Sequence, residues 1–296
     1  MKKLIILIAA VLTLNFQLLT INCSAQWYQS GLDGLSVYSI VSDNNNIFAG
    51  TDSGVYLSTD SGNTWTYKGL LNENSVNSIL INGTTIFAAT GQGVFLSNDN
   101  GNSWSYCGLC GDTVSSLTIS GTNIFAGVYN YISGTGGVYL STNNGGSWLM
   151  VNNGINPRVM SIANNDTNIF AGTVGGGIFL STNNGNSWNA VNNGITGTCV
   201  GPILVFGSKI FVSIWCPMGL YLSTDNGNSW VPINSTNPAV EAFTVSGINI
   251  YAVTNGTGVY LSTNYGNSWT AVNNGLSYPT LCSIAIKGNY IYVGTN

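Results

Sequence analysis

The residues that could carry chemistry are few and scattered. The chain holds no histidine, and its 296 residues include only 6 Lys or Arg and 10 Asp or Glu. Without histidine, a Ser–His or Cys–His nucleophile and a histidine-bound metal site are impossible. A glycosidase needs two carboxyl groups flanking one bond, and the only glutamates, Glu73 and Glu241, lie far apart in the sequence. We therefore expect no catalytic residues, metal or cofactor. Glu241 with an aspartate remains as the glycosidase alternative.

The cysteines favour disulfides over catalysis. Cys107 and Cys110 have C-x-x-C spacing, but no second pair completes a zinc site, and a redox role would need a following helix. We expect a local disulfide there, or two reduced core cysteines. Cys199 and Cys216 flank Gly207-Ser208. If those two residues form a hairpin turn, the two cysteines face each other across neighbouring strands, and we predict a disulfide between them.

The first 25 residues read as a signal peptide. Lys2 and Lys3 precede an apolar run from Leu4 to about Leu19, and Cys23-Ser24-Ala25 offers a small-residue cleavage site. The run is short for a membrane span, so an uncleaved anchor and a lipid-modified Cys23 are the lesser alternatives. We predict residues 1–25 as the leader and residues 26–296 as one domain, in a secreted, periplasmic or cell-surface protein.

The remaining chain is acidic. Residues 26–296 keep Lys68, Arg158, Lys209 and Lys287 against all ten acidic residues, a net charge of −6. A nucleic-acid binder needs many cations to neutralise phosphates, and an anionic membrane surface attracts basic segments. We expect neither partner, no membrane insertion after cleavage, and a monomer.

Three short phrases recur at a period of about forty residues, which is typical of a four-stranded propeller blade. The first phrase centres on Val37, Val76, Val114, Val159, Val200, Val240 and Leu281. The second resembles Asn46-Ile-Phe-Ala-Gly50, and the third resembles Gly54-Val-Tyr-Leu-Ser58. All are rich in β-branched and aromatic residues between Gly and Asn turns, so each predicts a strand. A fourth strand begins at the tryptophan that follows each third phrase.

These strands are apolar on both faces, so their sheets must be covered on both sides. Sheets stacked radially around an axis satisfy this, whereas an open solenoid would need polar end caps. We predict an all-β, seven-bladed propeller of four-stranded antiparallel blades. Trp27 opens a fourth strand, and residues 281–295 supply a first and a second strand, so both termini would close the last blade. That blade lacks a third strand: either it has three strands, or the sequence stops early, which the ending Gly294-Thr295-Asn296 favours.

The segment from Ser58 to Trp65 has the S-x-D-x-G-x-x-W form. It resembles the Asp box, or BNR repeat, of a propeller group that includes sialidases, sortilin-type receptors and photosystem assembly factors. The resemblance implies a turn held by the Asp or Asn side chain, and a packed Trp. Its expected structural residues are Asp60, Asp99, Asn143, Asn183, Asp225, Asn264, Trp65, Trp104, Trp148, Trp188, Trp230 and Trp269. A calcium loop is a poor interpretation, because three boxes have Asn and no bidentate Glu follows.

The resemblance does not extend to sialidase chemistry. Sialidases clamp their substrate with three arginines, and this chain has only Arg158; lysine cannot supply the bidentate fork. We expect a non-catalytic binding or scaffold module for protein or glycan. The alternatives are a sialidase-like or other glycoside hydrolase, and a purely structural repeat of a larger cell-surface protein.

A candidate ligand site lies where the repeats differ. The turns between first and second strands and the boxes have similar sequences in every repeat, whereas the loops at the other end of the strands differ. Functional residues usually lie on variable loops of a rigid scaffold. There one alignment column reads Tyr, Asn, Ser, Met, Gly, Glu, Cys, and the loops add aromatic residues. Aromatic residues at a concave mouth suit sugars or peptides. The predicted channel-mouth residues are Tyr38, Asn77, Met160, Arg158, Glu241, Tyr129, Tyr131 and Trp215.

Overall fold

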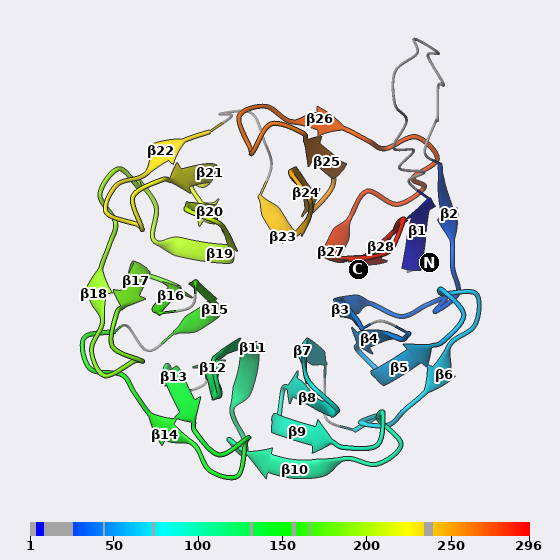
Figure 1. Cartoon of the computed structure of the whole chain (residues 1–296), viewed down its shortest axis with the longest axis horizontal. Coiled ribbons are helices and arrows are strands. Elements are labelled where there is room, and N and C mark those ends of the chain that lie inside the picture. The colour runs from blue at the N-terminus through cyan, green and yellow to red at the C-terminus, as the bar shows by residue number, and fades with distance from the viewer. Residues whose placement is uncertain are drawn as a thin grey trace.

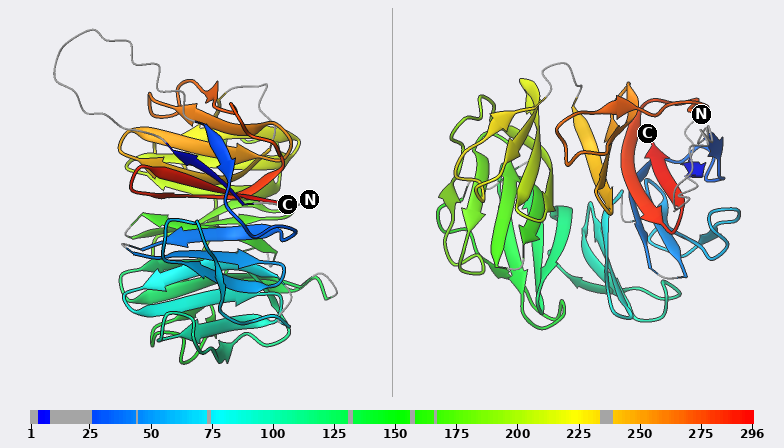
Figure 2. Two further views of the ribbon diagram at one scale, coloured as in Figure 1. Left: turned by 90° about the vertical axis from the view of Figure 1, so that its right-hand side faces the viewer. Right: turned by 45° about the horizontal axis from the view of Figure 1, so that its top comes forward.

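The computed structural model describes residues 4–8, 26–43, 45–72, 75–130, 133–155, 158–165, 167–233 and 239–296. Across these residues the chain forms a ring of four-stranded antiparallel sheets around a central channel (Figure 1). Seen from the side, the sheets stack as the segments of a thick disc (Figure 2). No helix in this part of the chain is long and apolar enough to cross a membrane.

Each sheet runs from a first strand at the channel to a fourth strand at the rim. The first strands are β3 (Val37–Ser42), β7 (Val76–Asn82), β11 (Thr113–Ser120), β15 (Val159–Asn165), β19 (Cys199–Phe206), β23 (Val240–Ser246) and β27 (Leu281–Lys287). The second are β4 (Ile47–Thr51), β8 (Thr85–Thr90), β12 (Asn123–Tyr129), β16 (Asn168–Thr173), β20 (Lys209–Cys216), β24 (Asn249–Thr254) and β28 (Tyr290–Thr295). The third are β5 (Gly54–Ser58), β9 (Gly93–Ser97), β13 (Gly136–Ser141), β17 (Gly177–Ser181), β21 (Met218–Ser223), β25 (Gly258–Ser262) and β1 (Leu4–Ile8). The fourth are β6 (Thr66–Tyr67), β10 (Ser105–Gly108), β14 (Leu149–Met150), β18 (Asn189–Ala190), β22 (Val231–Pro232), β26 (Thr270–Ala271) and β2 (Trp27–Gln29).

The predicted fold class requires a correction at the ends of the chain. Six blades, numbered one to six from β3–β6 to β23–β26, are each built from one continuous segment. The remaining sheet, in the order β2-β1-β28-β27, is a composite of both chain ends, and we call it the composite sheet. The prediction of a seven-bladed propeller, with a last blade closed by the N-terminal strand and either three-stranded or cut short, was therefore wrong: the structure is a six-bladed propeller with this composite sheet between its ends.

The third strand of the composite sheet is the apolar segment Leu4–Ile8, which pairs with β28 and with β2. Its register places Leu7 opposite Ile291. In blade one the corresponding pair is Ser58 with Ile47, so Leu7 occupies the position of a box serine. Cleavage after Ala25, which stays a prediction, would remove β1 and leave β28 without this neighbour.

The hydrophobic core lies between adjacent sheets. One cluster joins Phe87 and Val94 of blade two to Val114 and Leu117 of blade three, all less than a tenth exposed. The same packing closes the ring, because Val37 and Ile47 of blade one pack against Tyr292 of the composite sheet. Ser283 also donates its hydroxyl proton to the Val37 carbonyl at 2.8 Å. The two-sided apolar strands inferred from the sequence are thus buried by their neighbours.

The box tryptophans tie one sheet to the next. Each indole N–H donates to a main-chain carbonyl at the rim of the preceding sheet, as Trp188 does to Val151 at 2.7 Å. The same bond joins Trp27 to Val272, Trp65 to Ser30, Trp104 to Lys68, Trp148 to Cys107 and Trp230 to Val191. Trp269 is the exception: its buried indole nitrogen has no hydrogen-bond partner among the described residues.

The box turn is held by its own side chains. The Asp60 carboxylate accepts bonds from the Ser58 hydroxyl and the Thr64 amide, both at 2.9 Å, and from the Thr64 hydroxyl at 2.6 Å. Asn143 keeps the same acceptor and donates its amide to the Ser147 hydroxyl at 3.0 Å. Asp and Asn therefore interchange because the neighbouring hydroxyl can donate or accept.

Acid should weaken the three Asp-containing boxes selectively. Hydrogen bonds from Thr64 lower the pKa of Asp60 from 3.8 to about 2, and those from Ser103 do the same to Asp99. Hydrogen bonds from Ser229 also lower the pKa of Asp225. A depressed folded-state pKa stabilises the fold above the unfolded value and loses that contribution as the pH falls toward the folded one. We expect the triple variant Asp60→Asn, Asp99→Asn, Asp225→Asn to lose less thermal stability than the native chain between about pH 4 and pH 2. Parallel curves of melting temperature against pH would contradict this.

Candidate functional site

Every first strand carries a β-bulge close to its first residue. Pairing with the second strand skips a residue there, as between Val76 and Ser78 of β7. Bulges insert an unpaired residue and re-aim its side chain, and they are common beside functional sites. The skipped positions are Tyr38, Asn77, Ser115, Met160, Gly201 (with Pro202), Glu241 and Cys282. This is the alignment column singled out in the sequence.

The bulge residues line a cavity of about 460 Å³ at the mouth of the channel. The described lining is Tyr38, Asn77, Ser78, Ser115, Ser116, Tyr129, Met160, Ser161, Gly201, Pro202, Trp215, Glu241, Asn255, Cys282 and Asn296. Six of the eight predicted mouth residues belong to it. Arg158 instead lines a small adjoining pocket with Tyr129, Met160 and Val174, and Tyr131 lies outside the described residues. That these residues bind a ligand stays a prediction.

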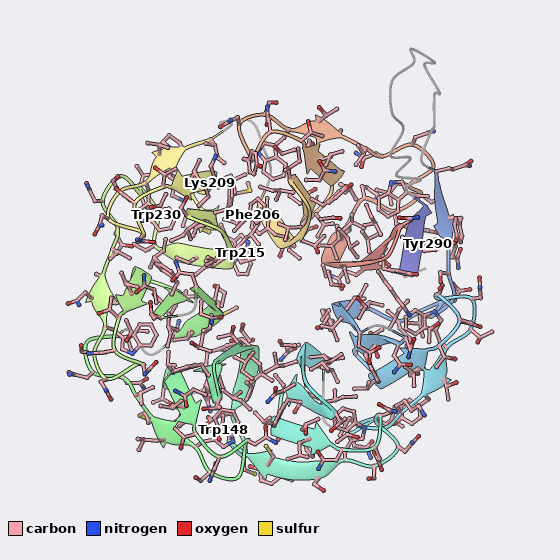
Figure 3. The ribbon with its side chains drawn as sticks, viewed as in Figure 1. Trp148, Phe206, Lys209, Trp215, Trp230 and Tyr290 are labelled. Atoms are coloured by element: carbon pink, nitrogen blue, oxygen red, sulfur yellow. The ribbon has the colours of Figure 1, made fainter. Side chains whose placement is uncertain are left out.

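Trp215 is a fixed aromatic surface in this mouth. It is the second-last residue of β20, at the inner side of blade five near the central opening, whereas Trp148 lies far out in its blade (Figure 3). Its indole N–H donates to the Val240 carbonyl of blade six at 3.3 Å. The ring covers the bulge at Gly201, where a Cβ would come within 2.6 Å of it. Blade five therefore has glycine in the bulge column because the indole fills that space.

Polar bulge side chains bridge neighbouring blades. The Asn77 amide donates to the Val114 carbonyl at 3.0 Å, and the Ser115 hydroxyl donates to the Val159 carbonyl at 2.9 Å. Ser161, next to a bulge, bonds to the Gly201 carbonyl at 2.6 Å. These side-chain bonds to main-chain carbonyls connect neighbouring blades around the mouth.

Glu241 has the one carboxylate side chain among the described lining residues. Burial raises its pKa above the usual range, and no bond or charge from a described residue opposes that effect. The carboxyl group therefore keeps its proton to a higher pH than an exposed glutamate would. Such a group can donate a hydrogen bond in mildly acidic solution, and can accept bonds once ionised.

The sequence interpretation missed part of the lining. Pro202, Asn255 and Asn296 reach the mouth, but none of them stands in the recurrent bulge column. The serines that follow the bulges, such as Ser78 and Ser116, looked like structural repeats because they recur. The available signal was their position directly after a variable residue.

The cysteines are partly as predicted. Cys199 and Cys216 are paired directly opposite each other on β19 and β20, as the hairpin argument requires. The predicted disulfide is absent from the structure, in which the five cysteines of the described residues form no disulfide. Cys110 is exposed, so Cys107 and Cys110 are not two core cysteines. Burial raises the pKa of Cys107 to about 11.

Comparison with solved structures supports the propeller fold. The chain is similar to the GH74 xyloglucanase from Xanthomonas campestris, with a TM-score of 0.71 and 14% identity over 91% of this chain and 52% of that enzyme. It is also similar to the extracellular domain of the putative one component system BT4673 from B. thetaiotaomicron, with a TM-score of 0.73 and 17% identity over 90% of this chain and 38% of that one. This chain thus spans about half or less of either protein.

A third solved structure is similar over its full length. YCF48 from Cyanidioschyzon merolae aligns with a TM-score of 0.68 and 15% identity, over 92% of this chain and 99% of that chain. All three identities are low, so the likeness concerns the fold alone. No protein-family model matches the sequence, and no curated protein matches it either.

Proposed function

We propose that this protein is a secreted, non-catalytic Asp-box propeller that binds a neutral saccharide in its channel mouth. The observation that carries the proposal is the ring of bulge residues, which differ from blade to blade on a scaffold that otherwise repeats. Amide and hydroxyl groups supply hydrogen bonds there, while Trp215, Tyr38 and Tyr129 supply aromatic faces. Apolar surface with a few directed polar groups is the usual make-up of a small-molecule site.

Several features support binding without turnover. Hydrolysis of a glycosidic bond needs two carboxyl groups at a defined separation, and Glu241 stands alone among the described lining residues. The GH74 neighbour is an enzyme by name, whereas the solved structures also include YCF48 bound to D1 peptide. A peptide ligand is therefore the second outcome that a binding experiment must address.

The test is a titration of the secreted protein with neutral oligosaccharides, such as cello-oligosaccharides and xyloglucan fragments, followed by calorimetry. We expect Trp215→Ala with Tyr129→Ala to weaken binding roughly thirtyfold, because each aromatic contact contributes about 1 kcal/mol. Tyr67→Ala is the matched control, since Tyr67 is a 44% exposed aromatic residue on rim strand β6. Equal losses in both variants, or no saccharide binding by the native protein, would refute the proposal.

An activity assay separates the enzyme alternative. We expect no new reducing ends after prolonged incubation with the same saccharides, for the native protein and for Glu241→Gln alike. Turnover that disappears in Glu241→Gln would instead make Glu241 a general acid, a role that its raised pKa would suit.

A further inference from the structure

The opposite face of the ring carries one departure from the repeat. The residue after the box Asp or Asn has a left-handed backbone in all six blades, with φ of 54° to 58°. In four blades this residue is Asn and in blade one it is Ser, both of which tolerate that conformation. In blade six it is Tyr265, at φ 57°. A bulky side chain there breaks a local rule, and such exceptions cluster at functional sites.

The residue of blade five that contacts Tyr265 also differs from its counterparts at other blade boundaries. Between blades two and three, Asn82 at the end of the first strand donates its amide to Asn144 in the next box at 3.3 Å. Asn165 and Asn226 repeat this pair between blades four and five at 3.5 Å. Between blades five and six the same two positions hold Phe206 and Tyr265. Their rings stack, with centroids 6.0 Å apart and planes 20° from parallel.

A cation completes the group. Lys209 stands opposite Phe206 across the hairpin of β19 and β20, and Figure 3 shows the two residues close together in blade five. Its ammonium group lies 5.6 Å from the centre of the Tyr265 ring and donates to the Tyr265 carbonyl at 3.2 Å. In blades three, four and six the position of Lys209 is asparagine.

These three residues, with Gly207 and Ser208, line a hollow of about 330 Å³ on the Asp-box face. Tyr265 is 44% exposed, so aromatic surface remains open beside an exposed ammonium group. Phe206 packs partly against the core cluster of Phe211, Leu222 and Ile250, whereas Tyr265 gains no such burial. We propose that this hollow is a second binding site, which takes an acidic saccharide of the uronic acid class.

The chemistry of the three side chains points to that class. The C–H face of a pyranose ring packs on an aromatic ring, which accounts for the exposed Tyr265 beside the half-buried Phe206. An ammonium group with unused N–H donors suits a carboxylate held at the side of that ring. Lys209 is also one of only four cations in residues 26–296 of a chain with ten acidic residues, so an anion is favoured here and disfavoured over most of the surface.

The experiment titrates the secreted full chain with a galacturonate tetramer and with a neutral galactose tetramer, by calorimetry at low and high salt. We expect the acidic tetramer to bind at least fivefold more tightly at low salt, and to lose that preference at 1 M NaCl, where the Debye length is about 3 Å. The double variant Phe206→Asn, Tyr265→Asn introduces the Asn pair that two other blade boundaries carry, so it should fold normally. We expect it to bind the acidic tetramer at least tenfold more weakly.

Two further variants locate the effect. Lys209→Asn should remove the preference for the acidic tetramer while leaving weak, equal binding of both sugars. Tyr67→Ala, which replaces a 44% exposed aromatic residue on rim strand β6 that lines neither hollow, should leave this binding unchanged. Equal affinity for both sugars in the native protein, or undiminished binding in the double variant, would overturn the proposal.

Discussion

Replacement of Trp188 by alanine should lower the free energy of unfolding by about 3–5 kcal/mol. The indole is only 3% exposed and packs with Phe125 and Val151 of blade three. Its N–H donates to the Val151 carbonyl at 2.7 Å, so truncation opens a cavity and leaves a buried acceptor unpaired. Urea denaturation followed by circular dichroism measures the change, with the midpoint expected to fall and the slope to stay constant.

Phenylalanine at two positions separates packing from hydrogen bonding. Trp188→Phe removes a bonded N–H, whereas Trp269→Phe removes a buried N–H that has no partner among the described residues. We expect Trp188→Phe to lower the free energy of unfolding by about 1 kcal/mol more than Trp269→Phe does. Trp188→Phe breaks a hydrogen bond, whereas Trp269→Phe removes a donor that has no partner among the described residues. Equal costs would show that the inter-sheet bonds of the tryptophans add little to their packing.

The blades were predictable because their sequence constraints are local and recur. Alternation of apolar residues on both faces required covered strands, and the tryptophan after each box fixed the start of the rim strand. Only the third strand of the composite sheet was not predictable, because Leu4–Ile8 is equally compatible with the apolar part of a leader and with a buried strand. A five-residue apolar run carries no periodicity that separates these states.

The position of the candidate site was predictable from the sequence, whereas its lining residues were predictable only in part. The variable column coincided with the bulges because an unpaired residue is free to vary while its paired neighbours are not. Arg158 lines the small adjoining pocket instead of the mouth, because it precedes β15 and lies two residues before the bulge residue Met160. The Phe206–Tyr265 pair was missed because its two residues belong to different positions of the repeat and to neighbouring blades. An alignment of the repeats therefore does not place them side by side.

Mild oxidation should join Cys199 to Cys216 and raise the free energy of unfolding by about 3 kcal/mol, the loop-closure value for about 18 residues. The two residues are directly opposite on neighbouring strands, where the separation of Cα atoms suits a disulfide. Burial, and to a lesser extent Cys216, raises the pKa of Cys199. Because the thiolate is the reacting species, oxidation should be slow near pH 7 and faster at higher pH. Peptide mapping by mass spectrometry without reductant identifies the bond.

Cysteine variants supply the controls for that experiment. Cys199→Ser should abolish the gain in stability on oxidation, while Cys282→Ser, on a different strand at the channel mouth, should preserve it. The strands are already paired, so any gain must come from the unfolded chain, and it should appear as slower unfolding rather than altered binding at the mouth. Oxidised protein in which both thiols remain free, or in which Cys199→Ser gains as much stability, would contradict the prediction.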